Sequence, residues 1–315
     1  ILGRVAESTV RETDAPWLTE DRYEDLVVHR LHCGTTHRRD PISLHVSAPA
    51  RLRLVQEVVA AVRPDIVHLL HILGFSAEVI PTIHRMGIPV VFTPTDFWVV
   101  CPKITLRTTY DGTPCNGPGN GVNCVRCFQP MPPWVARVAL RIGASPLRQL
   151  HGRINSLHTI RQRVSEMVAK VNAAERVFPS TRFLADVLIR HGVEADRVKV
   201  IPYGTELGEL PEPVSVPVVF TAATPLRVGF IGTMAEIKGP HILLEALASL
   251  RVREHNITVD LYGPLDEAKP YDRRLQRRAR ALGPQVQCNG LLPFERLGAV
   301  LRGLHVLVVP SLWYE

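Results

Sequence analysis

The sequence predicts an α/β protein of two domains in which short parallel strands alternate with helices. Three observations support this prediction. Short apolar runs end repeatedly in Gly, Pro or Thr, as expected for buried strands followed by loops. Several segments between them carry apolar residues at helical spacing. The chain has 315 residues, of which 46% are hydrophobic, enough for the cores of about two soluble domains.

The N-terminal half contains four apolar runs that we interpret as strands, at residues 26–31, 66–70, 89–93 and 174–178. Helical spacing predicts helices at 52–62 and 183–189, the second beginning after Ser180 or Thr181 as the N-cap. We therefore assign residues 1–203 to a first domain, with a cysteine-rich loop at 96–130. Residues 204–224 form a linker, because Pro211, Pro213 and Pro217 disfavour a helix there. The second domain spans 225–315.

The second domain opens with an apolar strand at 228–231, followed by Gly232, then Lys238, then helical spacing over 242–250. A glycine lets the backbone approach a ligand closely, and a lysine beside a helix N-terminus can bind an anion. The pattern is typical of a site for a nucleotide diphosphate. An ordinary strand, turn and helix with an exposed lysine explains this pattern alone equally well.

Three further strand-like runs follow in order, at 259–264, 286–290 and 305–311, and each ends in turn residues. Together with the segment around Lys238, they resemble the C-terminal domain of the retaining GT-B glycosyltransferases of family 4. In that family a V-x-P-S element precedes a glutamate. Here the element V-V-P-S ends at Ser311, and Glu315 comes four residues later. The N-terminal half resembles the same family in P-D-I-V-H at 64–68, I-P-V-V-F-T at 88–93 and V-I-P-Y-G at 200–204.

This resemblance implies a GT-B fold, with two Rossmann-like domains facing an interdomain cleft. It also implies a retaining hexosyltransferase that uses a UDP- or GDP-linked sugar and a hydroxyl acceptor, without a cofactor for the chemistry. The acceptor class would be a cell-surface glycan, a lipid-linked sugar or a small molecule.

By resemblance, Lys238 stabilises the leaving diphosphate, Glu315 orients the sugar and Asp96 lies on the acceptor side. The implied donor-binding residues are Gly232, Thr233, Lys238, Gly263, Gly290, Ser311 and Glu315. Thr233 departs from the family, because many members place an arginine there. The alternative, purely structural interpretation is that Asp96 caps a turn and that Phe97 and Trp98 pack in the core.

The resemblance further implies a fragment that lacks both ends of the family's catalytic region. The chain begins after the family's first strand and glycine-rich loop, and Glu315 corresponds to the first of two paired glutamates. Parts of both sheets are therefore expected to lack the helices that would cover them. We expect this chain to have lowered stability and little or no activity.

Four cysteines lie within the predicted loop, at Cys101, Cys115, Cys124 and Cys127, and the last two form a C-x2-C pair. The segment T-D-F-W-x2-C-P at 95–102 resembles a cysteine-containing branch of the same family. Four thiolates can surround one zinc ion, and reduced cysteines or a labile disulfide are the alternatives. A structural zinc would hold a long loop in order.

Basic residues are concentrated between Trp134 and Lys170, where Glu166 is the single acidic residue. This segment is interpreted either as an amphipathic helix on an anionic membrane or as a solvated face packed on its own domain. No signal peptide or membrane span is visible, which predicts a cytoplasmic protein, peripheral on the inner face of the membrane. Nucleic acid is not expected as a partner. Two other functions stay open: a non-catalytic nucleotide-sugar-binding fragment and a zinc-stapled nucleic-acid-binding protein.

Overall fold

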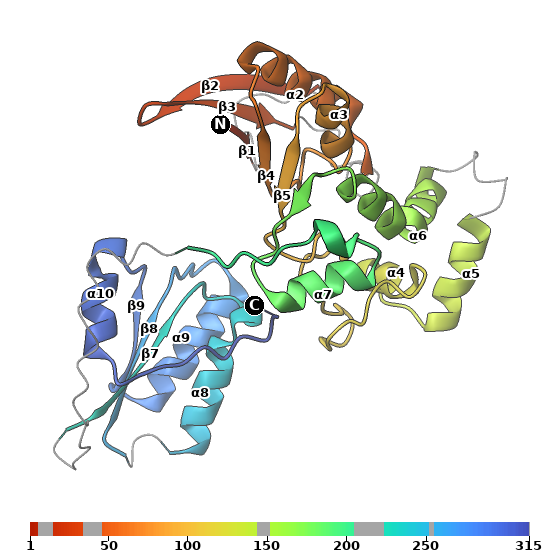
Figure 1. Cartoon of the computed structure of the whole chain (residues 1–315). Helices are drawn as coiled ribbons and strands as arrows, with labels where there is room; N and C mark the ends of the chain where they lie inside the picture. Colours follow the sequence, from red (N-terminus) through yellow and green to blue (C-terminus); the bar gives the residue numbers. More distant parts are fainter. Residues whose placement is uncertain (6–14, 34–45, 144–151, 205–223, 252–254, 315) are drawn as a thin grey trace. The chain divides into compact units, whose positions relative to one another are not determined.

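The computed structural model describes residues 1–5, 15–33, 46–143, 152–204, 224–251 and 255–314 (Figure 1). Backbone contacts divide the chain into two compact units, Ile1–Tyr203 and Gly204–Glu315. Each unit is described by itself below. Residues 205–223, nearly all of the predicted linker, and Glu315 lie outside the described residues.

The first sheet of the N-terminal unit contains β1 (Leu2–Val5), β2 (Trp17–Tyr23) and β3 (Leu26–His32), in the order β1-β3-β2. Strand β1 is parallel to β3, and β2 pairs with β3 as an antiparallel hairpin. The strand predicted at 26–31 is confirmed as β3. Sequence reasoning missed β1 and β2, and most β2 side chains are exposed, so they leave no apolar run to detect.

The second sheet is parallel, in the order β4-β5-β6, and contains β4 (Val67–Leu70), β5 (Val90–Thr93) and β6 (Arg176–Val177). The predicted strands at 66–70, 89–93 and 174–178 are confirmed, the last in shortened form. Central β5 is mostly buried, whereas Leu70 of β4 is 63% exposed. Val177 also bridges to Val198 in parallel, which extends the sheet past β6.

Helices of the N-terminal unit include α2 (Pro49–Val62), α3 (Val79–Arg85) and α7 (Arg182–Arg190). The predicted helices at 52–62 and 183–189 are confirmed. Thr181 is the N-cap of α7, because its side chain accepts a hydrogen bond from Leu184 N at 3.1 Å. A short 3-10 turn, η3 (Ala195–Arg197), follows α7.

Three further helices pack together in this unit: α4 (Val122–Phe128), α5 (Pro133–Gly143) and α6 (Gly152–Val171). Their shared core contains Cys124, Val125, Ala136, Leu140 and Ile160. The predicted basic helix is therefore two helices, with residues 144–151 between them outside the described residues.

The C-terminal unit is one parallel sheet of four strands with helices between them (blue in Figure 1). Its elements are β7 (Leu226–Ile231), η4 (Glu236–Lys238), α8 (Pro240–Ser249), β8 (Ile257–Tyr262), α9 (Pro270–Leu282), β9 (Val286–Gly290), α10 (Phe294–Gly303) and β10 (Val306–Leu307). The core lies where α8 and α9 meet the sheet, around Leu244, Leu261 and Leu275.

The strand order in this unit is β10-β7-β8-β9. The first strand, β7, therefore lies between the second and the fourth, so the chain turns in opposite directions on leaving β7 and on entering β10. In open parallel sheets ligands bind beyond the carboxyl ends of the strands at such a switch point. The topology thus directs attention to the loops after β7 and β10.

The lysine predicted beside a helix N-terminus lies there. Lys238 ends the 3-10 turn η4, and α8 begins at Pro240 after a left-handed Gly239. The ammonium group is thus carried by the turn rather than by the helix.

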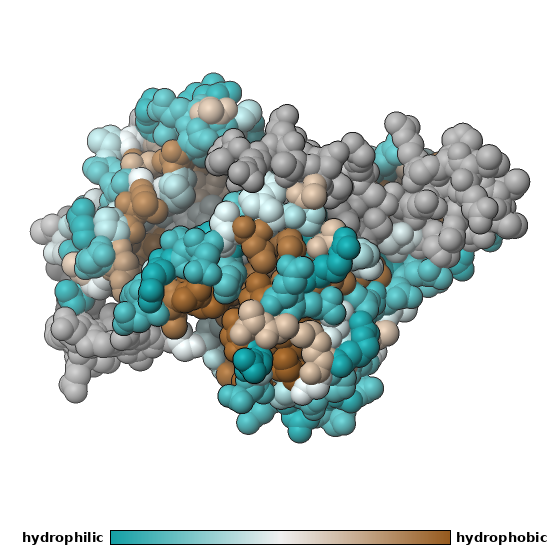
Figure 2. Space-filling view, turned by 90° about the horizontal axis from the view of Figure 1, so that it is seen from above, coloured by the Kyte–Doolittle hydropathy of each residue, from teal (hydrophilic) through white to brown (hydrophobic). Residues whose placement is uncertain are grey.

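Large apolar side chains are exposed at the edges of both parallel sheets. Ile66 and Leu70 are exposed at β4, and Val306, Leu307 and Val309 at β10. Figure 2 shows brown apolar areas among hydrophilic residues on one face of the molecule. Within the described parts of the chain, no helix combines the length and apolar character that crossing a membrane requires.

Gly239 supplies the first testable prediction. Its φ is +71°, and a Cβ atom there would lie 2.0 Å from the backbone oxygen of Pro310. Gly239→Ala should therefore lower the unfolding free energy of the C-terminal unit by about 2 kcal/mol or more, measured by thermal and denaturant unfolding.

Gly298→Ala is the matched control, because the added Cβ inside α10 would contact only the end of the Arg302 side chain at 3.9 Å. It should raise stability by roughly 0.5–1 kcal/mol. Equal effects of the two substitutions would contradict the close approach at Gly239.

Candidate functional site

The loops that follow β7 and β10 are joined to each other in the C-terminal unit. Leu312 N donates to Ile237 O at 2.8 Å, and Ser311 Oγ donates to the same oxygen at 3.4 Å. Gly239 lies directly against Pro310 O. The turn that carries Lys238 is thereby fixed to the segment that carries Ser311, as the resemblance required for a shared donor site.

Three predicted glycines follow neighbouring strands and lie along one edge of the sheet. Gly232 N donates to Tyr262 O at 2.9 Å, and Gly263 N donates to Gly290 O at 2.7 Å. A Cβ on Gly263 would lie 2.0 Å from Gly232 O, so this position requires glycine. A Cβ on Gly232 would meet only the Phe230 ring, at 3.5 Å. Packing therefore does not require glycine at 232, and its lack of a side chain leaves space beside the backbone.

Lys238 is the cation at this edge. Its Nζ lies 5.5 Å from the centre of the Trp313 ring. Partial burial lowers the pKa of Lys238, because it disfavours the charged ammonium. Sequence reasoning did not single out Trp313. Its position two residues after Ser311 indicated that it lies in the same predicted donor-binding segment. Trp313 Nε1 is buried and has no hydrogen-bond partner in the structure.

Thr233 lies at the same edge, directly after Gly232, and its side chain is exposed. Its hydroxyl can donate one hydrogen bond but brings no charge. Glu315 lies outside the described residues, so its predicted role stays a prediction. The structure therefore brings together the described donor-side residues Gly232, Thr233, Lys238, Gly263, Gly290 and Ser311.

Asp96 belongs to a separate site at the carboxyl ends of β4 and β5. Its Oδ2 accepts a hydrogen bond from His71 Nε2 at 2.8 Å, and its Oδ1 accepts from Trp98 N at 2.7 Å. The structural interpretation of Asp96 as a turn cap is confirmed by the hydrogen bond from Trp98 N. Phe97 and Trp98 are buried in the core. Its acceptor-side role stays a prediction.

His71 was not placed with Asp96 by sequence reasoning. Leu73 N donates to His71 Nδ1 at 2.8 Å, so the ring proton lies on Nε2 and is directed at the carboxylate. The His71 backbone has a φ of +63°, an uncommon conformation that its hydrogen bonds hold. The signal available in the sequence was position. His71 directly follows β4, Asp96 comes three residues after the end of β5, and the last residues of these adjacent strands, Leu70 and Thr93, pair.

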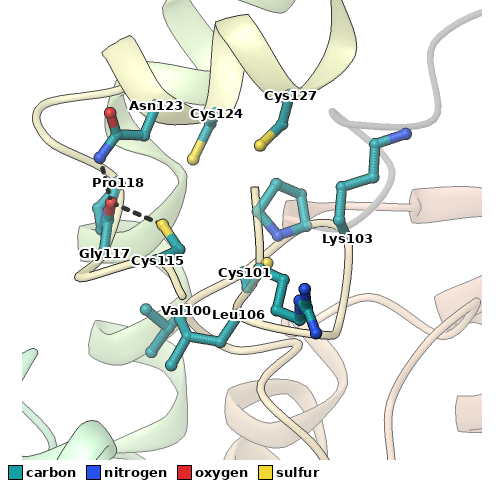
Figure 3. Close-up of a pocket in the computed structure, with 12 residues that line it drawn as sticks. Val100, Cys101, Lys103, Leu106, Cys115, Gly117, Pro118, Asn123, Cys124 and Cys127 are labelled. Atoms are coloured by element: carbon teal, nitrogen blue, oxygen red, sulfur yellow. Dashed lines mark hydrogen bonds between the residues drawn. The ribbon is translucent and has the colours of Figure 1, made fainter. Parts of the chain in front are cut away.

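The four cysteines of the predicted loop line one pocket of the N-terminal unit (Figure 3). Cys115 Sγ donates to Gly117 O at 3.2 Å. Burial raises the pKa of Cys101 and Cys115, and it raises that of Cys124 to about 12. Among the residues that the structure describes, no three of His, Cys, Asp and Glu already form a metal-ligand group. The four cysteines thus share a pocket but are not arranged as a metal-ligand group, and the zinc stays a prediction.

The comparisons with known proteins agree with the geometry of the C-terminal unit. Residues 225–315 match the family model of the group 1 glycosyl transferases. A search of curated proteins found no match.

Solved structures with the same fold cover nearly the whole chain. Sucrose-phosphate synthase from Thermosynechococcus elongatus is 17% identical, with a TM-score of 0.59, and the match covers 99% of this chain and 65% of that one. A UDP-forming α,α-trehalose-phosphate synthase from Burkholderia vietnamiensis is 12% identical, with a TM-score of 0.54 and coverages of 99% and 73%. HepE from Anabaena, in complex with UDP-glucose, is 16% identical, with a TM-score of 0.51 and coverages of 90% and 60%.

These likenesses show the fold, and the predicted α/β fold of the GT-B class is confirmed. The chain spans about two thirds of the length of the sucrose-phosphate synthase that it matches. The interdomain cleft and the activity stay predictions.

The lowered pKa of Lys238 gives a pH prediction. A diphosphate binds the protonated ammonium, so the affinity for UDP should fall as pH rises through this pKa, at a lower pH than an exposed lysine would give. Calorimetric titration between about pH 7 and 10 measures it.

The control is Lys238→Arg, because a guanidinium stays protonated throughout this range. The fall in affinity should be absent in this variant. An affinity that declines equally in both proteins would show that another group titrates, and would remove Lys238 as the anion-binding cation.

Proposed function

We propose that this protein is a glycosyltransferase that moves a hexose from a nucleotide diphosphate sugar to a hydroxyl acceptor with retention of configuration. The observation that carries the proposal is the joined pair of loops at the β7–β10 switch point, which holds Lys238 at the strand ends beside Ser311. Nucleotides bind at such points because strand ends leave room there and because loop amides and a cation can meet phosphate oxygens.

The structures matched above favour UDP over GDP as the carrier nucleotide. One neighbour is described as a complex with UDP-glucose, and another as a UDP-forming synthase. No described side chain here distinguishes uracil from guanine. The preference for UDP therefore comes from those neighbours and belongs to the proposal.

In the proposed reaction the bond between the anomeric carbon and the diphosphate oxygen breaks, the acceptor oxygen forms a bond to that carbon, and the acceptor's hydroxyl proton passes to the leaving diphosphate. Negative charge grows on the leaving diphosphate, so an ammonium and backbone N–H groups directed at it lower the barrier. Lys238 supplies the positive ammonium. A charge-assisted hydrogen bond from it would stabilise the leaving diphosphate by roughly 1.5–3 kcal/mol. Departure and arrival on one face of the sugar account for retention. By resemblance, Glu315 holds hydroxyls of the sugar.

We assign Asp96 to the acceptor side. It lies at the carboxyl ends of β4 and β5, and His71 and the Trp98 amide hold both of its oxygens in place. A carboxylate fixed in this way can still accept a hydrogen bond from an acceptor hydroxyl. Asp96→Asn should slow acceptor-dependent turnover while leaving UDP affinity unchanged, and a matching loss of UDP affinity would contradict the assignment.

Nucleotide binding tests the proposed function. Titration of the protein with UDP, GDP and ADP, and with UDP-glucose and GDP-mannose, should show saturable binding of one series. Lys238→Ala should weaken it about ten- to a hundredfold, because it removes one charge-assisted hydrogen bond.

Lys269→Ala is the matched control, because that side chain is 67% exposed and lies near Asp266 in the same unit. It should bind as the wild type does. Binding of one nucleotide without any sugar transfer or hydrolysis would favour the alternative, a non-catalytic nucleotide-sugar-binding protein. Binding of none, with retention of RNA or DNA, would favour the nucleic-acid alternative.

We also propose that α5 contacts an anionic membrane on the cytoplasmic side. Its inner face is packed, with Ala136 and Leu140 buried, while Trp134, Arg137, Val138 and Arg141 form an exposed stripe at helical spacing. Trp134 is 66% exposed. A tryptophan on the same exposed face as two arginines suits the boundary between lipid headgroups and acyl chains. Such a position would suit a lipid-linked acceptor.

Co-sedimentation with vesicles measures this contact. Binding to phosphatidylglycerol vesicles should exceed binding to phosphatidylcholine vesicles and should fall with salt, at about 1 kcal/mol per basic residue near the surface. Arg137→Glu should reduce it, and Arg302→Glu, on exposed α10, is the control for the same charge change. Equal loss in the two variants would show a non-specific charge effect.

A further inference from the structure

The pocket in Figure 3 is lined by all four cysteines of the 96–130 loop, which come from three separate stretches of chain. Cys124 and Cys127 lie one turn apart on α4, and their sulfurs point into the pocket in this view. Cys101 and Cys115 reach it from the segments after β5 and before α4. The other two cysteines of the chain, Cys33 and Cys288, do not line it.

Backbone hydrogen bonds hold the two loop cysteines in place. Cys101 N donates to Phe97 O at 2.7 Å, and Cys115 N donates to Leu106 O at 2.8 Å. Leu106 itself has a φ of +52° and Ile104 a φ of +73°. These conformations are costly for side chains of this size, so they persist only where the surroundings fix them strongly. The loop is thus shaped around the pocket at a local cost.

A buried cation also lies beside the pocket. The Arg163 guanidinium is buried, donates to Val99 O at 3.1 Å, and is influenced by Cys124 and Cys101. This positive charge favours the thiolate of Cys124, but burial outweighs it and raises the pKa of Cys124 to about 12.

We propose that these four cysteines bind one zinc ion as a structural tetrahedral site. Zinc is bound by four thiolates in many structural sites, including sites that carry a C-x2-C pair as one half of the ligand set. The site would carry a net charge of −2, and Arg163 would offset part of it. The proposal is independent of the proposed sugar transfer, because the pocket contains none of the residues assigned to donor or acceptor.

Zinc binding requires the sulfurs to move inward. Zinc–sulfur bonds of about 2.3 Å place tetrahedral sulfurs about 3.8 Å apart. The described residues do not yet form such a ligand group. Cys115 must give up its hydrogen bond to Gly117 O, and each thiol must lose its proton.

Metal content tests the proposal on the full chain. Protein produced with zinc in the medium should contain ~1 zinc per chain by mass spectrometry of the metal, and cobalt substitution should give the intense absorption of thiolate-to-cobalt charge transfer. Cys127→Ser and Cys115→Ser should each lose most of the bound zinc and the cobalt spectrum.

Cys288→Ser is the matched control, since it removes a half-buried cysteine of the chain outside the pocket, and it should retain the full metal content. If a pocket variant fails to fold, thiol counting on the wild type decides: zinc should protect four of the six cysteines from a thiol reagent until a chelator is added. Six reactive thiols with zinc present, or a mass 2 Da lower that indicates a disulfide, would overturn the proposal. A failure here leaves nucleotide binding untouched, so the two proposals are tested separately.

Discussion

The close approach of Gly239 to the backbone of Pro310 is the constraint on which the candidate donor site depends. It lets the turn after β7 lie directly against the segment after β10, and the Leu312–Ile237 hydrogen bond fixes that arrangement. Lys238 immediately precedes the glycine, so the position of its ammonium follows from this contact. A side chain at 239 would separate the two loops and move the cation away from Ser311.

The same logic governs the edge formed by the other glycines. Gly263 is required because the Gly232 oxygen occupies the space of a Cβ, and the Gly232 amide is used by Tyr262. Gly232 has no such packing reason. The space beside Gly232 is the room that the proposed ligand would use.

Sequence patterns predicted much of this fold, and the misses have physical causes. Strands β4, β5, β7, β8 and β9 could be predicted because apolar runs ending in turn residues indicate parallel strands. Strand β2 could not, because its exposed polar residues lack that signal. The helix after Lys238 was predicted from its spacing, but the 3-10 turn η4 and the left-handed Gly239 carry no apolar pattern that would reveal them. The pairing of His71 with Asp96 depends on strand adjacency, which one sequence does not give directly.

The cysteine pocket shows another limit of sequence reasoning. Spacing alone favoured no pairing among Cys101, Cys115, Cys124 and Cys127, because half of the pattern is irregular. The fold brings them together by placing α4 beside the segment after β5, around the buried Arg163. The spacing of the ligands is therefore set by the loop and by α4, not by a local motif.

Hydrogen–deuterium exchange of the full chain with and without UDP tests the central claim most directly. The account predicts that UDP slows exchange in the segments 232–239 and 309–313, which together form the switch-point edge, with little change in α9 or α10. Protection confined to other segments, or none under saturating UDP, would contradict the placement of a nucleotide diphosphate site at the ends of β7 and β10.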